Sequence, residues 1–246
     1  MSDYDSRISI RGSGPAIVLS PGLDGTGQLF YRQVPLLEKS HCVATYALRD
    51  DAPSMDVLAD DLRRVIEQAA PLEKRAIVMG ESFGGAVALT TALRYPENVS
   101  RLVVLNSFPY FAPQLRLRLA IAGVKIIPWG AMGMVRFATF FLHARRTHRD
   151  ELKKFLGFTV RATRMGYRNR LELLKSYDVR ERLRDIRCPA LFLAAEKDHL
   201  VSSVEQARLM AERVPSATVR VLSGHGHICL IAPDVDMNSI LAEWQS

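Results

Sequence analysis

The feature that most constrains this chain is a serine with a glycine two residues away on either side, in the run Gly80-Glu81-Ser82-Phe83-Gly84. The run 75–79, which is apolar after Arg75, precedes the motif and predicts a short buried strand, whereas residues 86–93 are mostly small and apolar and predict a helix. A serine at a turn from strand to helix adopts a strained backbone conformation, and small neighbours let that turn pack closely. The pattern therefore predicts a nucleophile elbow, in which the Ser82 hydroxyl stands above the edge of a sheet.

Strand-like and helix-like runs alternate along most of the sequence. This alternation is typical of an α/β fold, in which a mostly parallel, doubly wound sheet is covered by helices on both faces. The strands are expected at residues 7–10, 16–20, 42–48, 75–79, 102–106, 190–195 and 218–222. The main helices are expected at residues 55–70, 84–95, 204–214 and 234–244. The glycine-rich residues 12–15 predict a turn that joins the first two strands as a pair.

One interval, residues 108–187, contains no convincing strand and is expected to form several helices. We therefore predict a core made of residues 1–107 and 188–246, with residues 108–187 inserted as a helical cap. The interval also differs in charge, because 18 of the 33 Lys and Arg residues lie between Tyr110 and Arg187, against six acids. That interval thus carries +12 and the rest of the chain −5, which together give the net charge of +7.

The composition is ordinary for a globular protein, with 48% hydrophobic and 24% charged residues. The longest stretch without a charged residue, 102–115, has 14 residues, whereas a membrane-spanning helix needs roughly 20 apolar ones. The N-terminus carries Asp3 and Asp5, where a signal peptide would be basic. We therefore expect a cytoplasmic protein without a transmembrane segment.

The three cysteines, Cys42, Cys188 and Cys229, are far apart in the sequence. They lack the paired spacing of a zinc site or a redox couple, so we expect buried, reduced thiols. Cys229, which lies near His227, is a candidate for the wall of a pocket. A cysteine nucleophile is not expected while Ser82 is present.

A serine hydroxyl becomes a useful nucleophile only when a base removes its proton and a carboxylate orients that base. His227 and Asp198 each follow an apolar, strand-like run, so both are expected at the carboxyl edge of the sheet. The order Ser82, Asp198, His227 is the order of the triad on this type of sheet. Glu196 and His225, each two residues earlier, remain alternatives for the acid and the base.

Hydrolysis through such a serine also needs backbone N–H groups aimed at the oxygen that becomes negative in the tetrahedral intermediate. The run 20–27 follows an early strand and is rich in glycine, so it predicts a loop of this kind. We assign the two donors of this oxyanion hole to the N–H groups of Leu23 and Phe83. Asp24, in the same loop, is expected to form the turn by bonding nearby backbone.

Taken together, these pieces resemble the α/β-hydrolase superfamily over almost the whole chain. The matching segments are Pro21-Gly22-Leu23, Gly80-Glu81-Ser82-Phe83-Gly84-Gly85, Glu196-Lys197-Asp198 and Gly226-His227. One departure concerns the oxyanion loop, where Pro21 stands in place of the family's usual histidine and removes a side chain that often braces the loop. Within the superfamily the chain is similar to the small capped carboxylesterases, including those that hydrolyse acyl carrier protein esters.

The resemblance implies a serine hydrolase that cleaves carboxylic esters through an acyl-enzyme, without a metal or cofactor. Relatives that act as dehalogenases or epoxide hydrolases use an aspartate where this chain has Ser82. The alternatives still open are an acyltransferase or thioesterase that acts on acyl-CoA or acyl carrier protein substrates, and a receptor-like binding protein.

The basic character of residues 108–187 has two interpretations. It can reflect solvated helix faces, or it can attract an acidic partner to the pocket: an acyl carrier protein, a coenzyme A ester or an anionic membrane surface. The apolar stretch 117–142 can line an acyl pocket or rest on lipid. No nucleic acid partner is expected, because no stacking platform or binding motif accompanies the charge.

Overall fold

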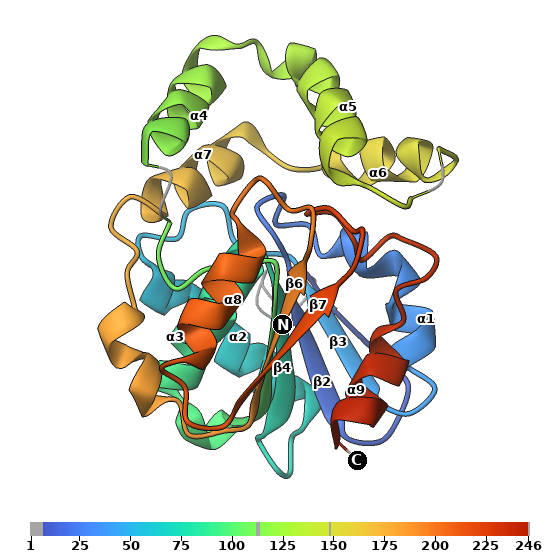
Figure 1. Cartoon of the computed structure of the whole chain (residues 1–246), viewed down its shortest axis with the longest axis vertical. Helices are drawn as coiled ribbons and strands as arrows, with labels where there is room; N and C mark the ends of the chain where they lie inside the picture. The colour runs from blue at the N-terminus through green and yellow to red at the C-terminus, as the bar shows by residue number, and fades with distance from the viewer. Residues whose placement is uncertain (1–6, 112–113, 148, 246) are drawn as a thin grey trace.

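The centre of the protein is a seven-stranded sheet with the strand order β1-β3-β2-β4-β5-β6-β7. The structure, a computed structural model, describes residues 7–111, 114–147 and 149–245 (Figure 1). β1 runs antiparallel to β3, and the other neighbouring strands are parallel. The strands are β1 (Ile8–Arg11), β2 (Ala16–Ser20), β3 (Cys42–Tyr46), β4 (Ala76–Glu81), β5 (Val99–Leu105), β6 (Ala190–Ala195) and β7 (Ala217–Leu222).

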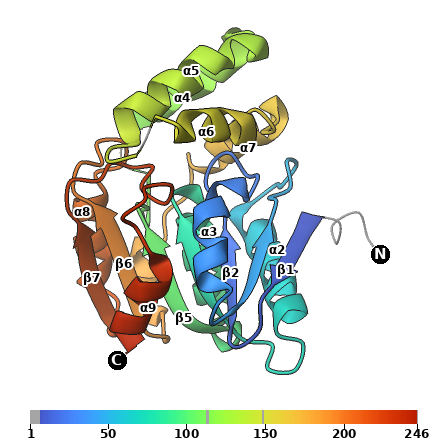
Figure 2. The ribbon, with the colours of Figure 1, turned by 90° about the vertical axis from the view of Figure 1, so that its right-hand side faces the viewer.

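The central strands β2, β4 and β6 are buried along their whole length. Their sequences are nearly continuous apolar runs, as expected of parallel strands that are covered on both faces. Helices α2, α3 and α8 contribute to the core on one face, and α1 and α9 to the core on the other (Figures 1 and 2). These five helices are α1 (Val34–Leu37), α2 (Met55–Ala69), α3 (Phe83–Arg94), α8 (Ser203–Ala211) and α9 (Met237–Gln245). The expected doubly wound α/β sheet is thus confirmed.

Four further helices lie between β5 and β6 in the chain and sit above the carboxyl end of the sheet, as both ribbon views show (Figures 1 and 2). They are α4 (Gln114–Ile126), α5 (Met132–His143), α6 (Glu151–Thr159) and α7 (Arg164–Leu173), and we call them the α4–α7 layer. Shorter 3-10 turns are η2 (Gln28–Arg32), η3 (Pro96–Asn98), η4 (Trp129–Ala131) and η5 (Arg180–Asp185). No described helix is long and apolar enough to cross a membrane by itself; Leu117–Ile126 and Trp129–His143 reach that length only as a pair bent by 119°.

The expectation that the first two strands pair with each other was wrong. β1 pairs with β3, with Ile8 opposite Tyr46. The cause lies in the connecting turn, where Gly12 and Gly14 have φ of 77° and 111°. A Cβ on Gly12 would lie 2.4 Å from the His41 carbonyl oxygen, so the turn packs against the segment that leads into β3. The turn between β1 and β2 therefore crosses the end of β3, which lies between these two strands in the sheet.

Candidate active site

Ser82 stands between the end of β4 and the start of α3 with φ 54° and ψ −118°. Positive φ is costly for a residue with a side chain, so the surrounding structure must hold it. The Ser82 N–H donates to the Leu105 carbonyl at 2.9 Å, and the Ser107 hydroxyl donates to the Ser82 carbonyl at 2.6 Å. Both bonds use backbone atoms of Ser82, so neither of them occupies its side-chain hydroxyl.

The glycines around Ser82 are required by close backbone contacts. A Cβ on Gly80 would lie 2.2 Å from the Gly84 carbonyl oxygen, and a Cβ on Gly84 would lie 2.1 Å from the Ser20 carbonyl oxygen. No side chain fits at either position without moving the backbone. The glycine pattern of the sequence is thus explained by the packing of the elbow against the end of β2.

The structure brings Ser82, His227 and Asp198 into one hydrogen-bonded chain. His227 Nε2 lies 2.9 Å from Ser82 Oγ, and His227 Nδ1 lies 2.8 Å from Asp198 Oδ2. The other carboxylate oxygen of Asp198 accepts from the N–H of Leu200 at 2.9 Å and, more weakly, from that of Val201 at 3.4 Å. Burial acts to raise the pKa of Asp198, but His227 and these backbone donors outweigh it and lower the pKa. Asp198 is therefore a buried carboxylate that stays charged beside the imidazole.

The two alternative residues lie apart from this chain. His225 Nε2 is 3.4 Å from Asp234 Oδ2, and its carbonyl accepts from the Lys197 N–H at 2.7 Å. Glu196 accepts from the Gly224 N–H at 2.7 Å and from the Ser223 hydroxyl at 2.9 Å. The bond from Gly224 above all, then the bond from the Lys197 ammonium and that from Ser223, lower the pKa of Glu196 to about 2. Both residues therefore tie the loop after β6 to the loop after β7, and neither reaches Ser82.

The pKa of His227 lies above its ordinary value of 6.5. Burial alone would lower it, but the charge and hydrogen bond of Asp198 favour the imidazolium more strongly, and Glu81 adds to this. Glu81 is buried next to Ser82, and desolvation raises its pKa to about 7. Glu81 is therefore only partly ionised near neutral pH, and its charge, where present, favours the protonated form of His227.

A pH profile of activity tests the effect of Glu81 on the pKa of His227. A base must be neutral to accept the serine proton, so activity is lost as pH falls through the pKa of His227. Because that pKa is raised, we expect the acid limb of kcat/KM to have its midpoint above pH 6.5. Glu81→Gln removes a negative charge that favours the imidazolium, so it should move the midpoint to lower pH while the plateau changes little. An unmoved midpoint would show that Glu81 has no electrostatic effect on the base.

Asn106 is a residue of this site that the sequence interpretation missed. Its side-chain N–H₂ donates to the His227 carbonyl at 2.7 Å, and its side-chain oxygen accepts from the Ala195 N–H at 2.7 Å. Asn106 therefore links the end of β5 to β6 and to the histidine loop. Cys229 is fully buried near the Asn106 amide, and burial raises the pKa of its thiol. It lines neither of the cavities that contain Ser82.

The loop expected to form the oxyanion hole is shaped by its own turn and by an arginine from α7. The Gly25 N–H donates to the Gly22 carbonyl at 3.0 Å. Asp24 accepts from the Thr26 N–H at 3.4 Å and from the Thr26 hydroxyl at 2.9 Å, so the expected bond from Asp24 to nearby backbone is observed. Leu23 and Phe83, the expected donors, line one cavity together with Ser82. The loop and the elbow thus face the same space.

Arg170 braces this loop from the α4–α7 layer. It is 1% exposed, and its Nε and Nη2 donate to the carbonyls of Leu23 at 3.0 Å and Asp24 at 3.1 Å. Its Nη1 lies 3.2 Å from the Asp50 carboxylate, which partners the buried charge. The peptide whose carbonyl Arg170 binds follows the Leu23 N–H, so the guanidinium limits rotation of the loop. Arg170 thus holds the loop in a chain where Pro21 replaces the histidine that often does so in the family.

Loss of this brace should slow turnover more than it weakens binding. We expect Arg170→Met to lower kcat by about 10- to 100-fold with a smaller change in KM, since a misplaced oxyanion donor stabilises the transition state less. Arg170→Lys keeps the charge but loses the planar fork, so it should recover activity only in part. Arg168→Met, which removes an exposed charge two residues away, is the matched control. A rise in KM at constant kcat would contradict the positioning role.

Two cavities meet at Ser82. They share Leu23, Ser82, Thr139, Tyr167 and Leu200 in their walls. The first, of about 150 Å³, is lined mostly by apolar side chains but also by three charged ones, Asp24, Glu81 and Arg136, and we call it the arginine chamber; its own lining also includes Trp129 and Phe155. The second, of about 200 Å³, is apolar, and we call it the phenylalanine chamber; its own lining includes Phe83, Phe108, Phe111, Leu117 and Leu171. A bound molecule can thus place one part on each side of the serine.

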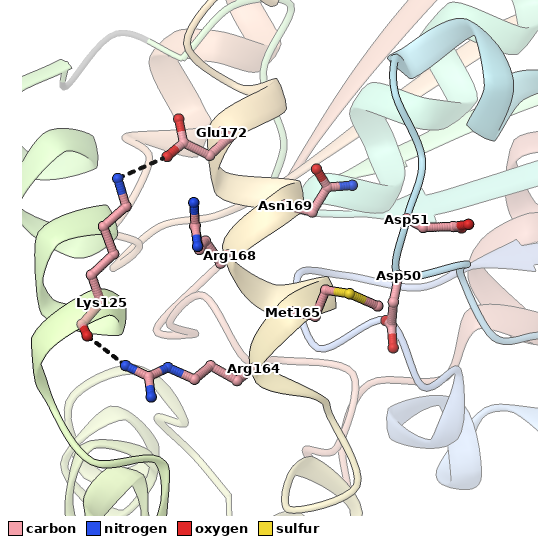
Figure 3. A pocket seen from close by; sticks show the side chains of 8 residues that line it. All are labelled: Asp50, Asp51, Lys125, Arg164, Met165, Arg168, Asn169 and Glu172. Atoms are coloured by element: carbon pink, nitrogen blue, oxygen red, sulfur yellow. Dashed lines mark hydrogen bonds and ion pairs between the residues drawn. The ribbon is translucent and has the colours of Figure 1, made fainter.

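A larger hollow, of about 620 Å³, is lined by residues of α4, of α7 and of the loop after β3, and it does not include Ser82. Figure 3 shows α7 between Lys125 of α4 and Asp50 of the core. Lys125 pairs with Glu172 at 3.6 Å, and Arg164 donates to the carbonyls of Val124 and Lys125. These charges are used to hold α7 against α4. Within the described ranges no group of three or more His, Cys, Asp or Glu side chains could hold a metal ion.

Comparison with known proteins agrees with this fold. A model of the α/β-hydrolase fold matches residues 15–232. A relative from Azorhizobium caulinodans, provisionally named carbamate hydrolase RutD, is 31% identical over 250 residues, which span 95% of this chain and 92% of the relative.

Solved structures share the fold at low sequence identity. A hydrolase from Pseudomonas aeruginosa PA01 superposes with a TM-score of 0.84 at 20% identity, over 97% of this chain and 93% of that one. The enol-lactonase of Burkholderia xenovorans LB400 gives a TM-score of 0.83 at 20% identity, over 97% and 95% of the two chains. By sequence and by fold, this chain is a member of the α/β-hydrolase family and a hydrolase.

Proposed function

We propose that this hydrolase is a serine esterase that cleaves carboxylic esters through an acyl-enzyme. The observation that carries the proposal is the hydrogen-bonded chain from Ser82 through His227 to Asp198, placed where two chambers meet. Such a chain turns a weak hydroxyl into a nucleophile, because the proton has an acceptor and the acceptor has an oriented counter-charge.

In this proposal Ser82 Oγ attacks the ester carbonyl while His227 Nε2 takes its proton. The N–H groups of Leu23 and Phe83 stabilise the oxygen that becomes negative. His227 then gives the proton to the departing alcohol, which leaves an ester between the acyl group and Ser82. Water attacks this acyl-enzyme by the same route, releases the acid and restores the serine. Asp198 stays ionised throughout.

A carbamate is the second candidate substrate, because the relative from Azorhizobium caulinodans is provisionally named for carbamate hydrolysis. Its carbonyl passes through the same kind of tetrahedral intermediate, so the same residues would serve. The enol-lactonase with the same fold acts on a cyclic ester, which keeps lactones within the ester class to be tested.

A substrate panel tests the proposal: p-nitrophenyl esters from acetate to laurate, a lactone, an alkyl carbamate and acyl-CoA thioesters. Turnover of the esters above the other classes supports a carboxylic esterase, and the preferred chain length reports the size of the chambers. A preference for the carbamate or for the thioesters would contradict the assignment as a carboxylic esterase and would favour a carbamate hydrolase or a thioesterase instead. Addition of an alcohol or thiol acceptor separates hydrolysis from acyl transfer, since an acyltransferase would give the new ester instead of the free acid.

The basic charge of residues 108–187 supports a further proposal, that acidic substrates such as acyl carrier protein esters are steered toward the site. Arg145 and Arg149 are exposed, whereas Arg146 is tied to the Ser223 carbonyl at 2.9 Å. Replacing Arg145 and Arg149 with Gln should lower kcat/KM for an acyl carrier protein ester far more than for a neutral aryl ester, and added salt should reduce the difference. Equal losses on both substrates would contradict steering.

A further inference from the structure

Arg136, on α5, lines the arginine chamber with Ser82 but takes no part in the triad, the elbow or the oxyanion loop. Its Nη2 is shielded from solvent and forms no hydrogen bond with any described residue. A charged donor that has lost its water and gained no partner is costly, so such groups are rare unless they serve a purpose. A ligand that fills the chamber can supply the missing acceptor.

The guanidinium is held in place by an aromatic side chain. Its Cζ lies 5.0 Å from the centre of the Trp129 ring, which itself packs edge-on against Tyr167 at 6.0 Å. Both aromatic residues line the arginine chamber. Contact with a ring uses the face of the guanidinium and leaves the N–H groups at its edge for hydrogen bonds. Arg136 is thus positioned before any ligand binds.

The acids in the same chamber do not neutralise Arg136. Asp24 accepts from Thr26, and its charge acts on Arg170. Glu81 lies beside Ser82 and acts on His227. In the described part of the chain neither carboxylate lies within ion-pair distance of Arg136. A bound molecule can therefore supply the counter-charge that Arg136 lacks among the described residues.

We propose that Arg136 binds a carboxylate on the substrate, so that the preferred substrates are short esters or lactones with a free carboxylate remote from the scissile bond. The acidic half of the substrate occupies the arginine chamber, and the other half lies in the apolar phenylalanine chamber. Two N–H groups of a guanidinium can donate to the two oxygens of a carboxylate, and this ion pair is stronger where water is excluded. This inference rests on the proposed ester hydrolysis and specifies its substrate class.

Matched substrates separate charge from shape: the monomethyl and dimethyl esters of succinate, glutarate and adipate. The wild-type protein should have a higher kcat/KM for at least one monoester than for its diester. Arg136→Met, which keeps the length of the side chain, should lower kcat/KM for that monoester by about 10- to 100-fold, since a hydrogen-bonded charge has been removed. The diester, which offers Arg136 no charge, should lose much less kcat/KM than the monoester. Arg136→Lys should have a kcat/KM for the monoester between that of the wild type and that of Arg136→Met.

Arg168→Met is the control, because it removes one positive charge from the α4–α7 layer at an exposed position outside the arginine chamber. It should leave the preference for the monoester intact. Equal losses on monoester and diester in Arg136→Met, or the absence of any preference for a monoester in the wild type, would overturn the inference. Failure to hydrolyse any ester would instead count against the proposed function.

A binding measurement addresses the inference without catalysis. Calorimetric titration of the Ser82→Ala variant with succinate, glutarate and adipate should detect binding of at least one dicarboxylate. Adding Arg136→Met should abolish that binding, and the thermal unfolding midpoint of each variant shows whether it is folded. If no dicarboxylate binds to the folded Ser82→Ala variant, Arg136 has another partner.

Discussion

Replacement of Ser82 with alanine should lower ester hydrolysis by about 10⁴- to 10⁶-fold, which is the range found when a triad nucleophile is removed. The structure indicates that the fold will survive the change. The hydrogen bonds that hold the elbow use the N–H and carbonyl of Ser82, and alanine keeps both. Alanine also carries the same Cβ as serine, so the strain at positive φ changes little. Loss of activity would therefore report chemistry and not unfolding.

The measurement is kcat/KM on p-nitrophenyl acetate together with covalent labelling by a fluorophosphonate, followed by mass spectrometry. The wild type should gain one label on the peptide that contains Ser82, and the variant should gain none. Ser216→Ala, at an exposed position after α8, is the control and should behave as the wild type. Undiminished hydrolysis by the Ser82→Ala variant would exclude Ser82 as the nucleophile.

The parts of this protein that were predictable from sequence are those whose causes lie within a few residues. The elbow depends on contacts between Gly80 and Gly84 and on the strand before them, so its pattern is visible in a short run. The central strands are buried on both faces, so each appears as an apolar run. The α/β sheet followed from these local signals.

Other features depend on residues far apart in the chain. Arg170 is one of 18 basic residues in its interval, and only the fold places it against Leu23, 147 residues earlier. The choice between His225 and His227 had the same limit, because the two lie two residues apart in one loop and only their distant partners, Asp234 for one and Asp198 and Ser82 for the other, distinguish them. The pairing of β1 with β3 depends on where a glycine turn packs, which no local pattern reports.

The acid of the triad gives the second large effect. Asp198→Asn should lower kcat/KM by about 10³- to 10⁴-fold, because an amide in this position no longer fixes the tautomer in which Nε2 accepts the serine proton. It also removes the main charge that raises the pKa of His227, so the remaining activity should have its acid limb at lower pH than the wild type. The loss should appear in kcat, since Asp198 has no contact with the substrate chambers.

Glu196→Gln is the matched comparison, because it makes the same change of charge two residues away in the same loop. A glutamine oxygen can still accept from the Gly224 N–H and the Ser223 hydroxyl, so activity should stay within about threefold of the wild type. The two variants together separate the carboxylate that orients His227 from the one that joins two loops. A large loss in Glu196→Gln with a small one in Asp198→Asn would reverse the assignment, and the hydrogen bond that His227 Nδ1 donates to Asp198 would then be structural.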